Sequence, residues 1–154
     1  MRIRLVFVGG GARGEAGRLL EDYVRRIRRR CRIEVVAPRA ATGRAVRGAS
    51  RAEREGRAAL AAAGEKSTVV ALDAGGARMT SEEFARWLGK ALAAGSTVSF
   101  VVGGAEGLSA EICRRADRRL SLSTLTLPHE LAQVLLCEQI YRAFSILEGA
   151  PYHR

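Results

Sequence analysis

The end of the chain carries side chains whose types suit proton transfer and the stabilisation of charge. Tyr152, His153 and Arg154 form a polar tail, and Arg142 lies on the long helical pattern that precedes it. Histidine has an ordinary pKa of about 6.5, so His153 is the best candidate for a general base. The arginines can stabilise negative charge that develops on an oxygen, and Tyr152 can stack on a planar ring. Chain ends are often frayed, but the apolar helix before Pro151 predicts a tail that lies back on the body.

A carboxylate precedes Arg142 by one helical turn. Glu138 and Arg142 are four residues apart, in the order that favours an ion pair on a helix, and Leu131 and Leu135 share their face. One interpretation is a surface pair that contributes only about 0.2–0.5 kcal/mol. The other is a functional pair in which Glu138 orients Arg142. The other positions of this helix are strongly apolar, which predicts partial burial of the pair.

Three candidate loops, residues 72–76, 103–107 and 121–128, are expected at the carboxyl ends of strands. Gly103 lacks a Cβ, so a ligand can approach the main chain closely, although a tight turn would use the same residue. Residues 121–128 alternate Ser or Thr with Leu, which is also typical of a half-buried strand. Pro128 keeps the residue before it extended and removes a donor. The exposed backbone groups of such a strand end can recognise the edge of a flat heterocycle.

The elements that must position these residues alternate along the chain. The hydrophobic pattern predicts strands over residues 2–8, 31–37, 67–72 and 97–102, and helices over 15–30, 51–63, 81–94, 110–117 and 129–148. Capping boxes at Ser50 and Thr80 predict two of the helix starts, and Ser109 is predicted to cap a third. Alternation of this kind predicts one α/β domain, residues 1–154, with a mostly parallel sheet and helices on both faces. The buried stripe of the first helix is predicted to be Leu19, Leu20, Tyr23, Val24 and Ile27.

The net charge of +10 is concentrated at the start of the chain. Residues 1–57 hold 16 arginines against 6 acidic residues, whereas the remainder is neutral. Such asymmetry favours a polyanionic partner, RNA or DNA, over a merely solvated basic surface. A loop over residues 39–48 adds Arg39, Arg44 and Arg47 to this basic region and is expected to be mobile.

Cysteine spacing and hydropathy exclude several classes of protein. The three cysteines, Cys31, Cys113 and Cys137, are widely separated and form no CxxC pair, so neither a metal site nor a disulfide framework is expected. No apolar run is long enough for a membrane span or a signal peptide. We therefore expect a soluble cytoplasmic protein without a resident metal.

Four stretches together resemble a known family. They are Phe100–Leu108, Leu120–His129, Glu138–Ala143 and Pro151–His153, and the resemblance extends over essentially the whole chain. The chain resembles the ribosomal large subunit methyltransferase H family, which is the pseudouridine N3-methyltransferase branch of the SPOUT superfamily. Two departures are Ala105, where relatives often carry Pro or Ser, and the glycine-rich loop over residues 10–14.

The resemblance implies a SPOUT-type α/β fold with a deep trefoil knot near the C-terminus, a homodimer, and S-adenosylmethionine bound in the knot. By motif position, the cofactor would be held by Leu72, Gly103, Gly104, Ser123, Thr124, Leu125, Thr126, Leu127 and Pro128.

The resemblance further implies methylation of N3 of a pseudouridine in 23S ribosomal RNA. Because one small domain has little surface for reading sequence, we expect the substrate to be an assembled ribosome. By residue type, the catalytic set would be His153 as base, Arg142 and Arg154 stabilising negative oxygens, Tyr152 contacting the target base, and Glu138 orienting Arg142. In a dimer, one chain would supply the cofactor and its mate part of the grip on RNA. The alternatives are a non-catalytic ribosome-binding factor and a related SPOUT methyltransferase that acts on transfer RNA.

Overall fold

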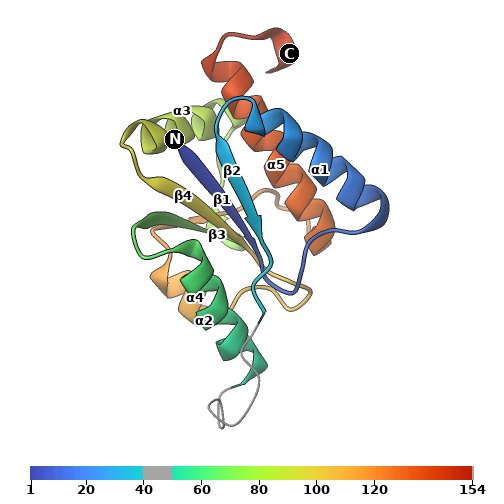
Figure 1. Cartoon of the computed structure of the whole chain (residues 1–154). Coiled ribbons are helices and arrows are strands. Elements are labelled where there is room, and N and C mark those ends of the chain that lie inside the picture. The colour runs from blue at the N-terminus through green and yellow to red at the C-terminus, as the bar shows by residue number, and fades with distance from the viewer. Residues whose placement is uncertain (40–49, 154) are drawn as a thin grey trace.

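A computed structural model describes residues 1–39 and 50–153 and shows one parallel sheet covered by helices on both faces (Figure 1). The strands lie in the order β2-β1-β4-β3-β5, and every pair of neighbours is parallel. Their bounds are β1 Arg2–Phe7, β2 Arg32–Val36, β3 Ser67–Ala77, β4 Thr97–Val102 and β5 Arg118–Leu120. The predicted α/β class and parallel sheet are confirmed, whereas the implied knot stays a prediction.

The helices divide into two layers. Their bounds are α1 Gly14–Arg28, α2 Arg51–Ala63, α3 Ser81–Ala93, α4 Ala110–Arg115 and α5 His129–Leu147, followed by the 3₁₀ turn η2 Pro151–His153. On one face α5 packs against both α1 and α3, and on the other α2 packs against α4 (Figure 1). Helices on both faces bury both sides of the central strands, which therefore read as continuous apolar runs.

Alternation along β1 supplies both hydrophobic cores. Ile3, Leu5 and Phe7 are fully buried in the larger cluster, which packs under α1, α3 and α5. Val6 and Val8 are directed to the smaller cluster beneath α2 and α4. Side chains of a strand point alternately to opposite faces, so one short segment anchors both layers.

The predicted helix starts at Ser50 and Thr80 are confirmed. The Ser50 side chain accepts a hydrogen bond from Glu53 N at 3.2 Å, and the Glu53 carboxylate accepts one from Ser50 N at 2.6 Å. Thr80 and Glu83 make the same reciprocal pair at the start of α3. Each box satisfies backbone donors that the first helical turn leaves free.

Three sequence predictions need correction. Leu19 is 48% exposed rather than buried, because it lies beside the packed stripe of α1 and faces solvent. β3 extends beyond Leu72 as far as Ala77. Leu72 and Ala77 both pair with Leu120, and residues 73–76 form an irregular excursion between them. No strand forms over residues 121–128, because this segment runs past the carboxyl end of the sheet. Of the loop predicted over residues 39–48, only the first residue falls among the described ones.

Candidate cofactor cavity and C-terminal tail

The three candidate loops meet at the carboxyl end of the sheet, where they line a cavity of about 650 Å³. All nine residues predicted to hold a cofactor line it. The cavity also takes in residues that the sequence analysis did not assign: Asp73, Ala74, Val102, Ala105, Gly107, Leu120, Ser121, Leu122, His129 and Ala132. Its volume is typical of small-molecule sites, which span roughly 300–1,000 Å³.

Backbone packing of the glycine-rich loop sets one wall of the cavity. Gly107 N donates to Gly104 O at 3.0 Å, which curls the loop back on itself. A Cβ on Gly103 would lie 2.6 Å from the backbone carbon of Gly107, and one on Gly104 would lie 3.1 Å from Val8 O. The loop therefore excludes side chains at both positions because neighbouring main chain fills the space.

The opposite wall is the segment that follows β5. Ser121 N donates to Ala77 O at 2.9 Å, and the Ser121 side chain donates to Ser123 O at 2.9 Å. Leu125 N donates to the Ser123 side chain at 2.9 Å, and the Leu125 side chain is 75% exposed. Beyond Ser121 N, which bonds to the end of β3, the backbone groups of residues 122–128 are not committed to a sheet ladder and can serve a ligand.

An ion pair holds the excursion from β3 against β5. Arg119 contacts the Asp73 carboxylate through Nε, at 2.8 Å, and through Nη2. The hydrogen bond to Asp73 raises the pKa of Arg119. A Cβ on Gly76 would lie 2.7 Å from the backbone of Arg119, so the glycine allows the close approach. The excursion thereby presents Asp73 and Ala74 to the cavity.

The glycine-rich loop after β1 is tied to the start of α5 by Gln133, a residue that the sequence analysis did not single out. Gln133 is fully buried, accepts from Ala12 N at 2.7 Å and donates to Gly10 O at 3.0 Å. Arg13 N donates to Glu130 at 3.2 Å nearby. The sequence signal for this role was the single amide of Gln133 within the apolar stretch 131–137, because a buried polar group needs hydrogen-bond partners.

At the other end of α5, Glu138 and Arg142 form the predicted pair. Oε1 of Glu138 accepts from Nε of Arg142 at 3.0 Å and from Nη2 at 2.6 Å. The side chains are 15% and 27% exposed, so partial burial is confirmed. The hydrogen bond to Glu138 raises the pKa of Arg142. The guanidinium is thus oriented from one side and fully charged.

Tyr152 folds back onto this pair and onto α1. Its ring meets Tyr141 edge to face, with the ring centroids 4.7 Å apart, and the Arg142 guanidinium lies 5.2 Å from its centroid. Its hydroxyl lies 3.2 Å from that of Tyr23, and its carbonyl accepts from Arg142 Nη1 at 3.5 Å. Burial, followed by the Tyr23 hydrogen bond, raises the pKa of Tyr152 to about 12. The prediction of a docked tail is confirmed for Tyr152.

The structure brings three of the predicted catalytic residues together, Glu138, Arg142 and Tyr152. His153 ends the 3₁₀ turn, but its side chain lies outside the described part, as does all of Arg154. The cluster shares no residue with the cavity of the same chain. Along α5, Ala132 of the cavity and Glu138 of the cluster are six positions apart, about 9 Å at the usual helical rise, and His129 and Arg142 are thirteen positions apart, about 20 Å.

Other chemistries find little support in the described residues. Within residues 1–39 and 50–153, no group of three His, Cys, Asp or Glu side chains could hold a metal ion. Over the same ranges, no helix is long and apolar enough to cross a membrane.

The chain belongs to the SPOUT methyltransferase family. A family model described as a predicted SPOUT methyltransferase matches residues 1–153. The chain is 38% identical to the ribosomal RNA large subunit methyltransferase H of Gemmatimonas aurantiaca over 154 residues, which is the full length of both. The proteins of the same name from Pseudomonas fluorescens and Clostridium kluyveri are 39% and 37% identical, again with full coverage of each chain.

Solved structures support the fold alone. A probable methylase family protein from Haemophilus influenzae matches with a TM-score of 0.57 at 16% identity, covering 99% of this chain and 70% of that one. TrmJ from Z. mobilis matches with a TM-score of 0.54 at 16% identity, covering 93% and 70%.

The protein is therefore an S-adenosylmethionine-dependent methyltransferase. The cavity fits this cofactor in size and in kind: apolar walls from Leu72, Leu122 and Leu127 suit a flat ring, while serine and threonine hydroxyls and free backbone groups suit a polar tail.

Proposed function

We propose that this enzyme methylates N3 of a pseudouridine in 23S ribosomal RNA, in the cytoplasm, on the assembled ribosome. The observation that carries the proposal is full-length similarity to proteins named ribosomal RNA large subunit methyltransferase H, joined to the intact Glu138–Arg142–Tyr152 cluster. One domain, residues 1–154, has little surface for reading sequence, which favours an assembled particle over free RNA.

The residues divide the work between binding and charge stabilisation. S-adenosylmethionine, when bound, supplies an electrophilic methyl group. The nine predicted cofactor residues, together with Asp73 and Ala74, would hold it in the strand-end cavity. N3 of the base loses an imide proton, and His153 is the proposed acceptor by residue type. Arg142, aligned by Glu138, and Arg154 would stabilise negative charge on the base oxygens, and Tyr152 would contact the base.

The separation between cavity and tail argues that the active unit is a homodimer. Arg142 lies about 20 Å along α5 from His129 at the cavity, so we infer that the tail of one copy reaches the cavity of another. The outer face of α5 offers a docking surface, because Leu131 is 52% exposed and Leu135 is only partly buried. A two-fold axis near Leu135, halfway along the span, would set each tail against the other cavity.

Complementation between two inactive variants tests this composite site. Gly103→Ala should damage the cavity, and Arg142→Ala should damage the tail cluster. In a mixed dimer, one site combines both lesions and the other combines both intact halves. Random mixing should therefore restore about a quarter of wild-type activity, since half the dimers are mixed and each has one good site. If the mixture stays as inactive as its components, each chain carries its own complete site.

Basic residues of the first third would grip ribosomal RNA. Within the described part of the chain, Arg28 and Arg29 at the end of α1 and Arg57 on α2 form no ion pair, whereas Arg25 and Arg26 pair with Asp22. We expect affinity for ribosomes to fall steeply between about 50 and 200 mM salt, because phosphate contacts release counterions. An affinity indifferent to salt would argue against an RNA grip.

One assay separates this function from its alternatives. In parallel reactions, purified protein and radiolabelled S-adenosylmethionine are incubated with either ribosomes or transfer RNA. Both acceptors come from a strain that lacks this enzyme. Label entering 23S RNA, located to N3-methylpseudouridine by mass mapping, supports the proposal. Label entering transfer RNA favours a related transfer RNA methyltransferase. Ribosome binding without label favours a non-catalytic factor.

A further inference from the structure

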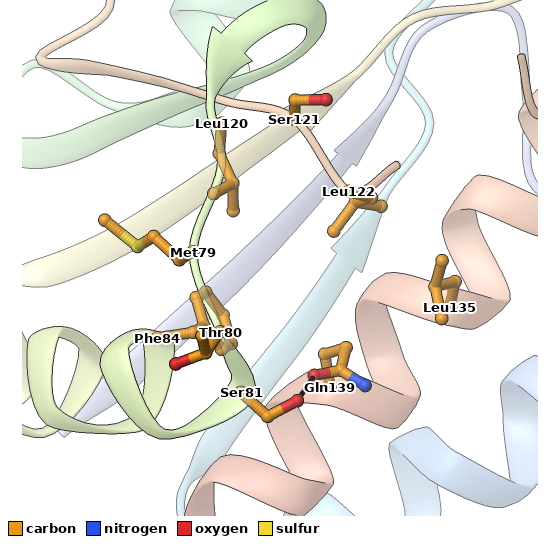
Figure 2. Close-up of a pocket in the computed structure, with 9 residues that line it drawn as sticks. All are labelled: Met79, Thr80, Ser81, Phe84, Leu120, Ser121, Leu122, Leu135 and Gln139. Carbon is orange, nitrogen blue, oxygen red and sulfur yellow. Dashed lines mark hydrogen bonds between the residues drawn. The ribbon is translucent and has the colours of Figure 1, made fainter. Parts of the chain in front are cut away.

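A continuous chain of hydrogen bonds connects the first residue of α3 to the arginine of the tail cluster. Ser81 Oγ donates to Gln139 Oε1 at 2.7 Å, as Figure 2 shows, and Gln139 Nε2 donates to Glu138 Oε2 at 2.6 Å. Glu138 Oε1, the other oxygen of that carboxylate, accepts both contacts from Arg142. The chain thus runs from Ser81 through Gln139 and Glu138 to the guanidinium.

The direction of this chain is fixed by what each group can do. A carboxylate can only accept, so the Gln139 amide must turn its NH₂ group toward Glu138. Its oxygen then faces Ser81, whose hydroxyl can donate. Arg142 occupies one carboxylate oxygen and Gln139 the other, so the plane of the Glu138 carboxylate is held from both sides.

The anchor of the chain lies beside the cofactor cavity. Ser81 and Gln139 line a smaller cavity of about 180 Å³ between the start of α3, the middle of α5 and the segment after β5 (Figure 2). This cavity and the larger one share Leu120, Ser121 and Leu122 as a common wall. The position of the Arg142 guanidinium is therefore set through a contact with α3 and not by its own helix alone.

An ion pair within one helix does not by itself fix a guanidinium. Pairs of this spacing are weak when exposed, and both side chains can rotate together. A carboxylate bonded on its second oxygen loses that freedom, and the Glu138 side chain is only 15% exposed. Outer partners of this kind determine how accurately a reacting group is placed.

We propose that Gln139 is a positioning residue for Arg142, acting through Glu138, and that Ser81 anchors Gln139. The inference rests on the proposed function only for what Arg142 does in the reaction. The geometric part, that Gln139 sets where the guanidinium lies, stands independently of it.

Substitutions at Gln139 test the positioning role by turnover and by structure. Gln139→Met keeps the volume but cannot donate or accept, and we expect kcat on ribosomes to fall about tenfold with an unchanged KM for the cofactor. Ser81→Ala removes only the anchor and should lower kcat about threefold, which covers the case in which the first variant folds poorly. Glu82→Gln, at an exposed neighbouring position, is the matched control and should behave as wild type.

The variant Gln139→Glu adds a measurement, the pH dependence of kcat, that would not change if Gln139 had only a structural role. Two adjacent carboxylates raise the pKa of one of them, so at low pH the introduced carboxyl group is protonated, donates to Glu138 and restores the chain. At higher pH both are charged, and repulsion displaces Glu138. The ratio of variant to wild-type kcat should therefore fall as pH rises from about 5.5 to 8.5. A ratio independent of pH would overturn the proposal.

Crystal structures of Gln139→Met and Ser81→Ala complete the test. A displaced or disordered Arg142 guanidinium, together with lowered kcat, supports the proposal. A guanidinium in its wild-type place, or a displaced one with normal kcat, overturns it. If wild-type protein fails to methylate ribosomes, the proposed function fails, and the position of Arg142 in these crystals still decides the geometric part.

Discussion

The sites at the two ends of α5 differ in the groups that form them, which are mainly backbone at the start of the helix and side chains toward its end. At its start, the candidate cofactor cavity is shaped by main chain, with Gly103 and Gly104 on one wall and the strandless segment 121–128 on the other. At its end, the tail cluster is made of side chains: Arg142 pairs with Glu138 and lies over the ring of Tyr152. We therefore expect the first end to recognise a ligand by shape and the second to supply charge.

This difference predicts which substitutions each end tolerates. A cavity formed by backbone should survive changes of surface side chain but fail when a Cβ intrudes. A cluster formed by side chains should keep its fold and its cofactor when one group is removed, but lose turnover. The predictions below test this division, beginning with the largest effect.

Arg142→Ala should lower kcat on ribosomes by about 100- to 1000-fold, the usual cost of removing a donor that stabilises developing charge. The affinity for S-adenosylmethionine, measured by calorimetry, should stay within about twofold because Arg142 does not line the cavity. Arg86→Ala, on the exposed face of α3, is the control. Wild-type turnover in the Arg142 variant would remove this residue from the mechanism.

Gly103→Ala should act in the opposite way. The new Cβ would meet the Gly107 backbone at 2.6 Å, and overpacking of this kind costs ~1–3 kcal/mol. We expect cofactor affinity to fall up to about 100-fold by calorimetry. Gly11→Ala is the matched control, since its Cβ would meet only the Phe7 ring at 3.8 Å. Equal affinity in the two variants would show that the cavity wall yields.

Tyr23→Phe should have a smaller effect on the tail end alone. It removes the hydroxyl that contacts Tyr152 and leaves both rings in place. A hydrogen bond of this type contributes about 0.5–1.5 kcal/mol, so kcat should fall about twofold to tenfold while cofactor affinity is unchanged. The companion variant Tyr152→Phe removes the other half of the same contact and should match it. A clear mismatch would give the Tyr152 hydroxyl a role in the chemistry.

The last and smallest effect is a dependence on alkaline pH. The pKa of Tyr152 is raised from 10 to about 12 by burial and by Tyr23, so the folded protein holds this proton more tightly than the unfolded chain. Its stabilising contribution is complete below about pH 10 and is lost as pH rises toward 12. Burial raises the pKa of Cys31 from 9 to about 11 and that of Cys137 from 9 to about 12, so their contributions are lost from about pH 9 upward and overlap the tyrosine's range. The difference in unfolding free energy between wild type and Tyr152→Phe, measured by denaturant titration, isolates the tyrosine.

Local signals predicted the helices well because their causes are local. The boxes at Ser50 and Thr80 involve residues three apart, and the Glu138–Arg142 pair four apart. The excursion after Leu72 and the strandless path of residues 121–128 were missed, since both depend on where the sheet ends rather than on the pattern of the segment. Alternation of Ser, Thr and Leu suits a cavity wall as well as a strand.

The sequence pattern could not predict contacts between residues that are far apart along the chain. Gln133 is an ordinary helical residue until the loop after β1 is placed beside it, and Tyr23 joins Tyr152 only because α1 packs on α5. The nine cofactor candidates nevertheless converge on one cavity, because carboxyl ends of parallel strands share an edge. Their role as cofactor ligands stays a prediction.

The hydrogen bonds of the Gln133 amide have a consequence for the order in which parts of the protein fold. Its bonds to Gly10 and Ala12 span more than 120 positions of the chain. Contacts this distant form slowly, because a large loop must close before they stabilise anything. During synthesis the loop after β1 can therefore make these bonds only after Gln133 has emerged, and the cavity lined by residues 120–129 and Ala132 is likewise completed late.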